Sequence, residues 1–262
     1  MNIRTISIMN DMHVHTLHSS DSGETMEAYI GRARKIGAGV ICFTDHLDVN
    51  PQDSGTAFYD SEAFFKDFDK TKVGTRDITL LGGVEFDCPH RYPKELAEIS
   101  RLPYDCIIGS VHYCDLSPDV FFSELVKSGV TAEDCYNAYW KEVLKCVTFG
   151  GFDVLGHIDI PKRYYKALIY DADLLREIFR VLLLNGAIIE INTSSLHKGI
   201  PDTMPGRDLL DIYRSEGGKY VTIGSDAHAA AELAADNAIA RGLIEEIGLS
   251  EVIYINRKMT VV

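Results

Sequence analysis

The sequence predicts an α/β protein whose parallel sheet is a closed or nearly closed (β/α)7 barrel of the TIM type. Short, β-branched apolar segments alternate with amphipathic segments of helical length, which is the pattern of βαβ units and a parallel sheet. The apolar segments are almost continuous in apolar character, as strands buried on both faces require. The length of 262 residues suits one such barrel. We therefore expect residues 1–262 to form a single domain.

The elements are expected in a regular order. Seven strands are predicted at residues 3–12, 39–44, 78–85, 106–111, 154–157, 187–191 and 220–224. Helices are predicted at residues 25–36, 131–149, 171–184, 205–215 and 229–247. Two of them begin at a threonine near acidic residues and end before Gly37 or Gly150, which are usual capping signals. Residues 48–75 are less regular, and we expect a loop or lid there before a helix.

Composition and charge argue against several classes of protein. The net charge is −13 and the pI is near 5.1, with no run of lysine or arginine, so nucleic acid is not an expected partner. No stretch reaches about 18 apolar residues, and the first residues lack a leader pattern, which predicts a cytoplasmic protein without a membrane anchor. The six cysteines form no CxxC pair and are expected to be buried free thiols. The sequence leaves a homo-oligomer open.

Histidines and carboxylates stand at the ends of the predicted strands. In barrel enzymes the carboxyl ends of the strands form the catalytic face, where residues from distant segments meet. A His-x-His pair on a strand places both imidazoles on one face. Imidazole and carboxylate ligands without cysteine suit zinc, manganese or iron. The sequence therefore predicts a metal site formed by His13, His15, Asp21, His46, Glu85, His112, His157, Asp226 and His228.

Three further aspartates lie beside these residues. Asp11, Asp45 and Asp159 are expected to orient the ligand imidazoles through hydrogen bonds rather than to bind a metal themselves.

The motifs resemble those of the PHP (polymerase and histidinol phosphatase) superfamily of metal-dependent phosphoesterases. The matching segments are DMHVHTLHSSDS, ICFTDHLD, GGVEFD, IIGSVHY, VLGHIDIPKRY, IIEINTSS and VTIGSDAH, and they run in the family's order from Asp11 to His228. Within the superfamily, the length and several segments look most like the stand-alone histidinol-phosphatases. The resemblance implies a distorted seven-stranded barrel with two to three divalent metal ions.

The resemblance also implies how the ligands are shared. One metal would be held by His13, His15, Glu85 and Asp226. A second would be held by His112 and His157, with Glu85 bridging to it. A third would be held by Asp21, His46 and His228.

The same ligands imply a route for phosphate-ester hydrolysis. Three divalent ions bring six positive charges, and Asp21, Glu85 and Asp226 offset three of them, so a phosphate dianion is attracted despite the negative net charge. A hydroxide bridging two metals would attack phosphorus in line. Asp226 or His228 would supply the proton to the leaving alkoxide, and Glu85 would hold the bridged pair.

Positive side chains on the loops are expected to bind the substrate. Arg163 follows the fifth strand, where a guanidinium can clamp phosphate with two hydrogen bonds. Lys198 and Arg207 stand on neighbouring loops. His197 occupies a position where the resembling proteins often have arginine.

The function that the resemblance implies is hydrolysis of L-histidinol phosphate in histidine biosynthesis. A phosphoesterase acting on another small ester, such as a nucleotide or sugar phosphate, is the nearest alternative. An amidohydrolase would share the His-x-His pair, but the middle strands carry Glu85 and His112 in place of a metal-bridging lysine. A metal-binding protein without catalysis is a third reading, which the complete ligand set opposes.

Overall fold

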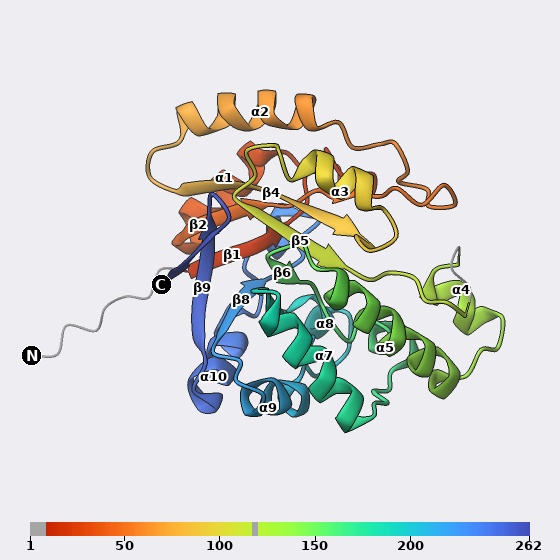
Figure 1. The fold of residues 1–262 in the computed structure, drawn as a ribbon. Helices are drawn as coiled ribbons and strands as arrows, with labels where there is room; N and C mark the ends of the chain where they lie inside the picture. The colour runs from red at the N-terminus through yellow and green to blue at the C-terminus, as the bar shows by residue number, and fades with distance from the viewer. Residues whose placement is uncertain (1–8, 117–119) are drawn as a thin grey trace, which may run out of the picture.

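A parallel sheet covered by helices forms the body of the protein (Figure 1). The computed structural model describes residues 9–116 and 120–262. The strand order is β1-β2-β4-β5-β6-β7-β8-β9-β10, and β3 pairs with β4. The parallel strands are β1 (Met9–Val14), β2 (Ala38–Phe43), β3 (His46–Leu47), β4 (Thr79–Asp87), β5 (Cys106–Ser110), β6 (Val154–Leu155), β7 (Ile188–Asn192), β8 (Tyr220–Gly224) and β9 (Ser250–Ile255).

All seven predicted strand positions carry a strand, although their bounds shift. Positions 3–8 of the first predicted strand lie outside the described residues. Strand β6 is shorter than predicted, because the backbone N–H of His157 donates to the Glu190 carboxylate rather than to a neighbouring strand. Strand β9 and the antiparallel β10 (Lys258–Val261) form a C-terminal hairpin that the sequence analysis did not anticipate.

The two ends of the parallel sheet meet between β1 and the segment after β8. The N–H of Asp226 donates to the carbonyl of His13 at 2.8 Å, and the N–H of His15 donates to the carbonyl of Ala227 at 2.9 Å. Near the amino end of β1, Asn10 donates to Glu251 of β9 at 3.0 Å. Apart from the isolated bridge between Val14 and Ala227, no ladder of backbone hydrogen bonds closes the sheet among the described residues, so these contacts bring β1 against the segment after β8 without completing a barrel.

Two apolar clusters follow the alternation of the strands. Along β2, for example, Ile41 and Phe43 belong to the large cluster that includes the helices, whereas Val40 and Cys42 belong to a smaller one. The smaller cluster also contains Tyr254 of β9. Since side chains alternate between the faces of a strand, these clusters are the layer under the helices and the packed interior of the barrel. All six cysteines are buried free thiols, as predicted.

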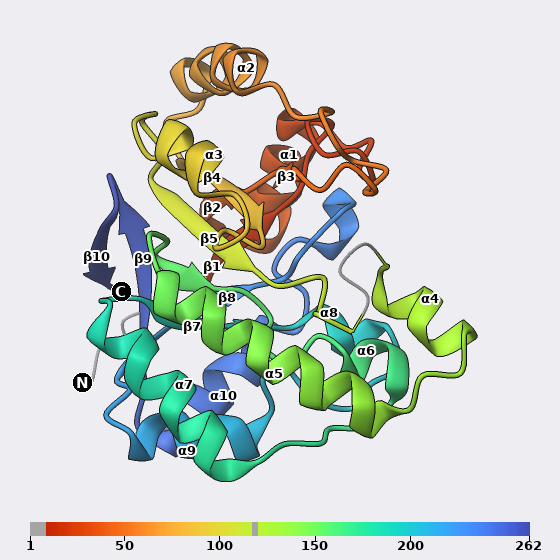
Figure 2. The same cartoon turned by 45° about the vertical axis from the view of Figure 1, so that its right-hand side comes forward.

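Helices cover the outside of the sheet (Figure 2). They are α1 (Met26–Ile36), α2 (Ser61–Gly74), α3 (Pro93–Ile99), α4 (Phe122–Lys127), α5 (Ala132–Phe149), α6 (Lys162–Tyr165), α7 (Ala172–Leu184), α8 (Ser194–His197), α9 (Arg207–Ser215) and α10 (Asn237–Ile247). The Thr25 and Thr131 side chains cap α1 and α5 as predicted.

The helix predicted at 229–247 is divided in the structure. It consists of a short 3-10 turn, Ala230–Glu232, followed by α10, because Ala234 and Asp236 have positive φ and interrupt the helix. The irregular region 48–75 is a loop followed by α2, as expected.

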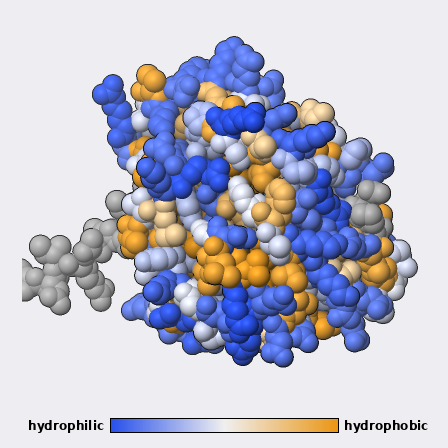
Figure 3. Space-filling view, viewed as in Figure 1, coloured by the Kyte–Doolittle hydropathy of each residue, from blue (hydrophilic) through white to orange (hydrophobic). Residues whose placement is uncertain are grey.

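Hydrophilic residues cover most of the face seen in Figure 3, and apolar residues form smaller patches between them. Among the described residues, no helix is both long and apolar enough to span a bilayer.

Candidate metal centre

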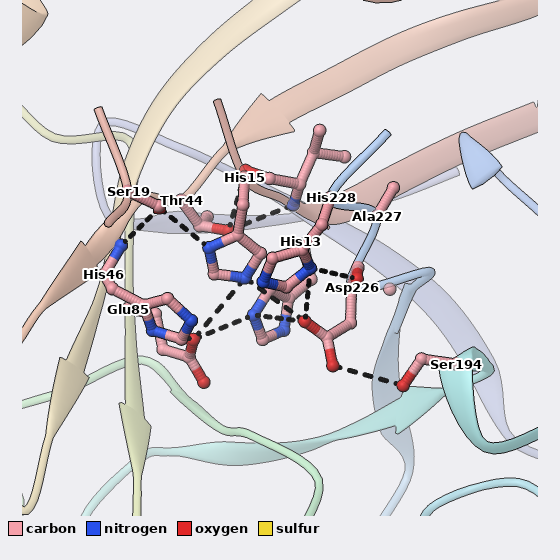
Figure 4. Close-up of polar contacts among 12 residues, drawn as sticks. His13, His15, Ser19, Thr44, His46, Glu85, Ser194, Asp226, Ala227 and His228 are labelled. Carbon is pink, nitrogen blue, oxygen red and sulfur yellow. Dashed lines mark hydrogen bonds and ion pairs between the residues drawn. The ribbon is translucent and has the colours of Figure 1, made fainter. Parts of the chain in front are cut away.

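Side chains from the carboxyl ends of the strands converge on Glu85 (Figure 4). The Oε2 atom of Glu85 lies 3.2 Å from Nε2 of His13, 3.5 Å from Nε2 of His15 and 2.9 Å from Nδ1 of His46. Its Oε1 atom lies 2.9 Å from Nε2 of His157 and 3.7 Å from Nε2 of His112. The two carboxylate oxygens thus face two different sets of imidazoles, which is the position of a bridging ligand.

Asp226 completes the first of these sets. Its Oδ1 lies 3.2 Å from Nε2 of His15 and 3.9 Å from Nε2 of His13. Asp226 adopts a φ of 54°, which is unfavourable for a residue with a side chain. The backbone hydrogen bond to His13 holds the residue there and directs the carboxylate toward the two imidazoles.

Asp21, His46 and His228 form a third group toward the rim. Nε2 of His228 lies 3.1 Å from Oδ2 of Asp21, and Nε2 of His46 lies 3.6 Å from the same oxygen. The ring of His15 lies between the other two imidazoles, with ring centroids 4.2 Å from His46 and 4.3 Å from His228. The Asp21 side chain is 53% exposed, so this group is the one that solvent reaches most easily.

The buried polar atoms of this cluster fit divalent metal ions. Nε2 of His13, Nε2 of His15 and Oε2 of Glu85 are buried and have no hydrogen-bond partner among the described residues. Such atoms are costly unless something else satisfies them. Three groups within the cluster hold their donor atoms within 4.8 Å of one another: His13 with Glu85 and His157; His13 with His15 and Asp226; His15 with His46 and His228.

The charges of the cluster also favour bound cations. Burial lowers the pKa of His13, but the negative charges of Glu190 and Glu85 more than offset this and raise it well above the usual value. The pKa of His15 is lowered well below the usual value, first by burial and then by His46 and His228. Burial opposes the charge of His46 too, yet Glu85 raises its pKa to about 10. Carboxylates thus attract positive charge into a group of imidazoles that cannot all be protonated, and metal ions resolve this conflict.

Hydrogen bonds from the protein orient the imidazoles. Glu190 Oε1 lies 2.7 Å from Nδ1 of His13, which leaves Nε2 for a metal. Ser19 Oγ lies 3.1 Å from Nδ1 of His15 and donates to Asp45 at 2.8 Å. Asp45 thus acts through Ser19.

The other two aspartates have different partners from those expected. Asp11 accepts hydrogen bonds from Ser225 and from backbone N–H groups, and Asp159 pairs with Lys162 at 2.7 Å. Neither contacts a ligand imidazole in the described structure. The sequence analysis did not predict that Glu190 orients His13. Its position near the end of a strand could have indicated this role.

A model of the PHP domain matches residues 11–194. The chain belongs to the PHP domain family.

Several relatives of this PHP chain have names that state an activity. A probable histidinol-phosphatase of Clostridium acetobutylicum is 29% identical over 95% of this chain and 98% of its own length. A probable histidinol-phosphatase of Thermotoga maritima is 31% identical over 84% of each chain. The crystal structure of histidinol phosphate phosphatase from Lactococcus lactis, in complex with zinc, L-histidinol and phosphate, has a TM-score of 0.82 and 24% identity, covering 96% of this chain and 98% of that one. This structural match confirms the predicted fold class.

A cavity of about 780 Å³ opens beside the candidate metal centre of this PHP chain. Arg163 and Lys198, both predicted to bind substrate, line it. Arg163 donates to Ser194 Oγ and, at 2.9 Å, to Oδ2 of Asp226. Burial and the nearby Arg163 guanidinium lower the pKa of Lys198. The metal-centre residues among its lining are Asp21, His46, His112, His157, Asp226 and His228.

Two other residues predicted to bind substrate, His197 and Arg207, are not among the residues that line this cavity. His197 turns away to Asp236, with Nδ1 3.1 Å from a carboxylate oxygen. Arg207 is half exposed on α9, where it pairs with Glu246 and Asp211. Both side chains point toward carboxylates of the outer helices and loops. The sequence pattern does not predict this orientation.

Proposed function

We propose that this chain is a zinc-dependent phosphoric monoester hydrolase that converts L-histidinol phosphate to L-histidinol and phosphate, a step of histidine biosynthesis. Relatives with this activity in their names cover nearly the whole chain. The observation that carries the proposal is the position of Arg163, which lines the same cavity as the metal-centre carboxylate Asp226 and donates to it. A phosphate group in that cavity would meet a guanidinium and the metal centre together.

The metal centre would hold two to three ions, with manganese and iron as alternatives to zinc. The ligands would be those predicted: His13, His15, Asp21, His46, Glu85, His112, His157, Asp226 and His228. When bound, the ions would lower the pKa of a water molecule and offset the negative charge that develops on the phosphoryl oxygens.

The protein's own side chains would direct the rest of the reaction. Glu85, between the two sets of imidazoles, would offer one carboxylate oxygen to the ligands of each set. Arg163 and Lys198 would bind the phosphoryl oxygens. His228, at the solvent-facing rim, or a water molecule held by His228 or Asp226 would give the proton that the leaving alkoxide needs.

The proposal is tested with the purified protein and a panel of phosphate monoesters in the presence of zinc or manganese. We expect the highest kcat/KM for L-histidinol phosphate, two to three ions per chain by elemental analysis, and loss of turnover in H13A and D226A that still fold. A higher kcat/KM for a nucleotide or sugar phosphate would instead support the alternative substrate class. A single-domain organisation and a cytoplasmic location stay predictions from the sequence, which leaves a homo-oligomer open.

A further inference from the structure

The cavity beside the metal centre has a second charged region. Its lining includes Asp48 and Asp53, with the aromatic side chains Tyr113, Phe121 and Tyr164 close by. Asp48 is 9% exposed. It forms no hydrogen bond or ion pair with another described residue. His46 and His112 are near enough to act on this carboxyl group electrostatically, but a nearly buried carboxylate that accepts no hydrogen bond is still costly in the free protein. Its position on the cavity wall points to a positively charged ligand.

A second carboxylate lies behind Asp48. Asp87 is 1% exposed, and its Oδ2 has no hydrogen-bond partner among the described residues. Oxygen atoms of Asp48 and Asp87 and a ring nitrogen of His112 all lie within 4.8 Å of one another. The two aspartates therefore place two neighbouring carboxyl groups at one end of the cavity.

The hydrogen bonding of His112 favours an organic cation over a further metal ion at this point. Its Nδ1 lies 3.3 Å from Oδ1 of Asp87, while its Nε2 faces Glu85. A proton on Nδ1, donated to Asp87, leaves the lone pair of the ring on Nε2 for the metal centre. Asp48 and Asp87 then offer only carboxylate oxygens, which are good acceptors for the N–H groups of an ammonium.

The neighbouring residues shape this end of the cavity. The hydroxyl of Tyr113 donates to Asp53, which fixes this third carboxylate at the wall. Phe121 packs against the rings of Tyr113 and Tyr164, with centroids 6.1 Å and 5.3 Å away. Aromatic rings suit the apolar part of a small ligand and also attract cations.

We propose that Asp48, supported by Asp87 and by the Tyr113–Asp53 pair, is an ammonium-binding site that selects phosphate esters bearing a protonated amine. The inference rests on the proposed function and adds the side chains that would bind the organic half of the substrate. Arg163 and Lys198 would receive the phosphate, and Asp48 would receive the ammonium, so that the substrate lies across the metal centre between opposite charges.

The test compares two esters that differ only in the amine: L-histidinol phosphate and 3-(imidazol-4-yl)propyl phosphate. We expect the ratio of their kcat/KM values to fall by about 10-fold or more in D48N, since a hydrogen bond to a charged group is lost. The affinity for L-histidinol, measured by calorimetry, should fall by a similar factor. E124Q removes another acid from the same cavity wall and should keep the wild-type ratio.

If D48N keeps both the kcat/KM ratio and the L-histidinol affinity of the wild type, the inference is wrong. If D48N instead loses one metal ion per chain with an unchanged ratio, Asp48 is a metal ligand and the inference is equally wrong. Should D48N not fold, Y113F releases Asp53 and is expected to lower the same ratio several-fold; an unchanged ratio there would also overturn the inference.

Failure of the proposed function can be recognised separately. A wild-type protein that does not hydrolyse L-histidinol phosphate would refute that function. The ammonium site is then tested with ethanolamine phosphate against ethyl phosphate. It predicts that the wild type prefers the amine and that D48N loses the preference, and equal kcat/KM values for the two esters in the wild type would overturn it.

Discussion

Arg163 donates from Nη2 to Oδ2 of Asp226 at 2.9 Å, while Oδ1 of the same carboxylate lies 3.2 Å from Nε2 of His15. One carboxylate therefore links His15 of the candidate metal centre to the arginine. This pairing keeps the guanidinium at the cavity wall, because the side chain is mostly buried and Ser194 binds the same nitrogen.

Replacing Arg163 by alanine is expected to lower kcat/KM for L-histidinol phosphate by about 100-fold, the effect of removing a charged hydrogen-bond donor from the phosphate. R163K should recover only part of the loss, because lysine lacks the two-pronged donor geometry. Steady-state kinetics with metal content checked by elemental analysis measures this. R207A is the matched control, since Arg207 pairs with Glu246 outside the cavity. Equal effects of R163A and R207A would contradict the assignment.

Glu190 is expected to set the metal affinity although it is not among the predicted ligands. It binds Nδ1 of His13 with one oxygen and the N–H of His157 with the other. Loss of such an orienting group typically weakens metal binding 10- to 100-fold, and we expect E190Q to lower zinc affinity by about that factor. Competition with a chromophoric chelator measures the affinity. E142Q, which removes another buried carboxylate remote from the centre, should bind zinc as tightly as the wild type.

The regular part of the fold and the gathering of the strand-end residues could be predicted from the sequence. Parallel strands place their carboxyl ends at one edge, so residues as distant in sequence as His13, Glu85 and Asp226 come together regardless of loop details. The period of two was enough to place both His13 and His15 in the centre, even though the β1–β2 ladder is irregular between Asp11 and Val14.

The features that the sequence did not predict depend on local backbone geometry. The β9–β10 hairpin turns at Asn256 and Arg257, both with positive φ and neither a glycine, so the usual turn signal is missing. The outward paths of His197 and Arg207 depend on carboxylates of the outer helices and loops. An unpartnered carboxylate such as Asp48 can be recognised only once its neighbours are known.

Glu142 makes stability depend on pH away from the metal centre. Burial raises the pKa of this carboxyl, but hydrogen bonds from His90 and Arg91 outweigh burial and hold it below its usual value of 4.5. A lowered pKa in the folded state means that the stabilisation is complete above about pH 4.5 and is lost as the pH falls toward the folded-state pKa. E142Q should lower the free energy of unfolding by about 3 kcal/mol at pH 7 and by less at pH 3. Urea unfolding of both metal-free proteins at the two pH values measures this; an equal cost at both would contradict it.

Gly224, at the end of β8, leaves space that the metal centre needs. A Cβ atom there would lie 2.1 Å from Oε1 of Glu190 and 2.4 Å from Cβ of His13. G224A must therefore displace the very pair that orients His13, and overpacking of this kind costs about 1–3 kcal/mol. We expect a lower melting temperature together with weaker zinc binding, measured by thermal unfolding with and without zinc.

Gly242, within α10, is the matched control for this substitution. A Cβ atom there meets no other atom within 4 Å, so G242A should stabilise the helix by about 0.5–1 kcal/mol and leave zinc binding as it is. The two variants make the same chemical change, and only G224A, beside Glu190, is expected to weaken zinc binding. Zinc affinity of G224A equal to that of G242A would mean that the His13–Glu190 contact does not govern the centre.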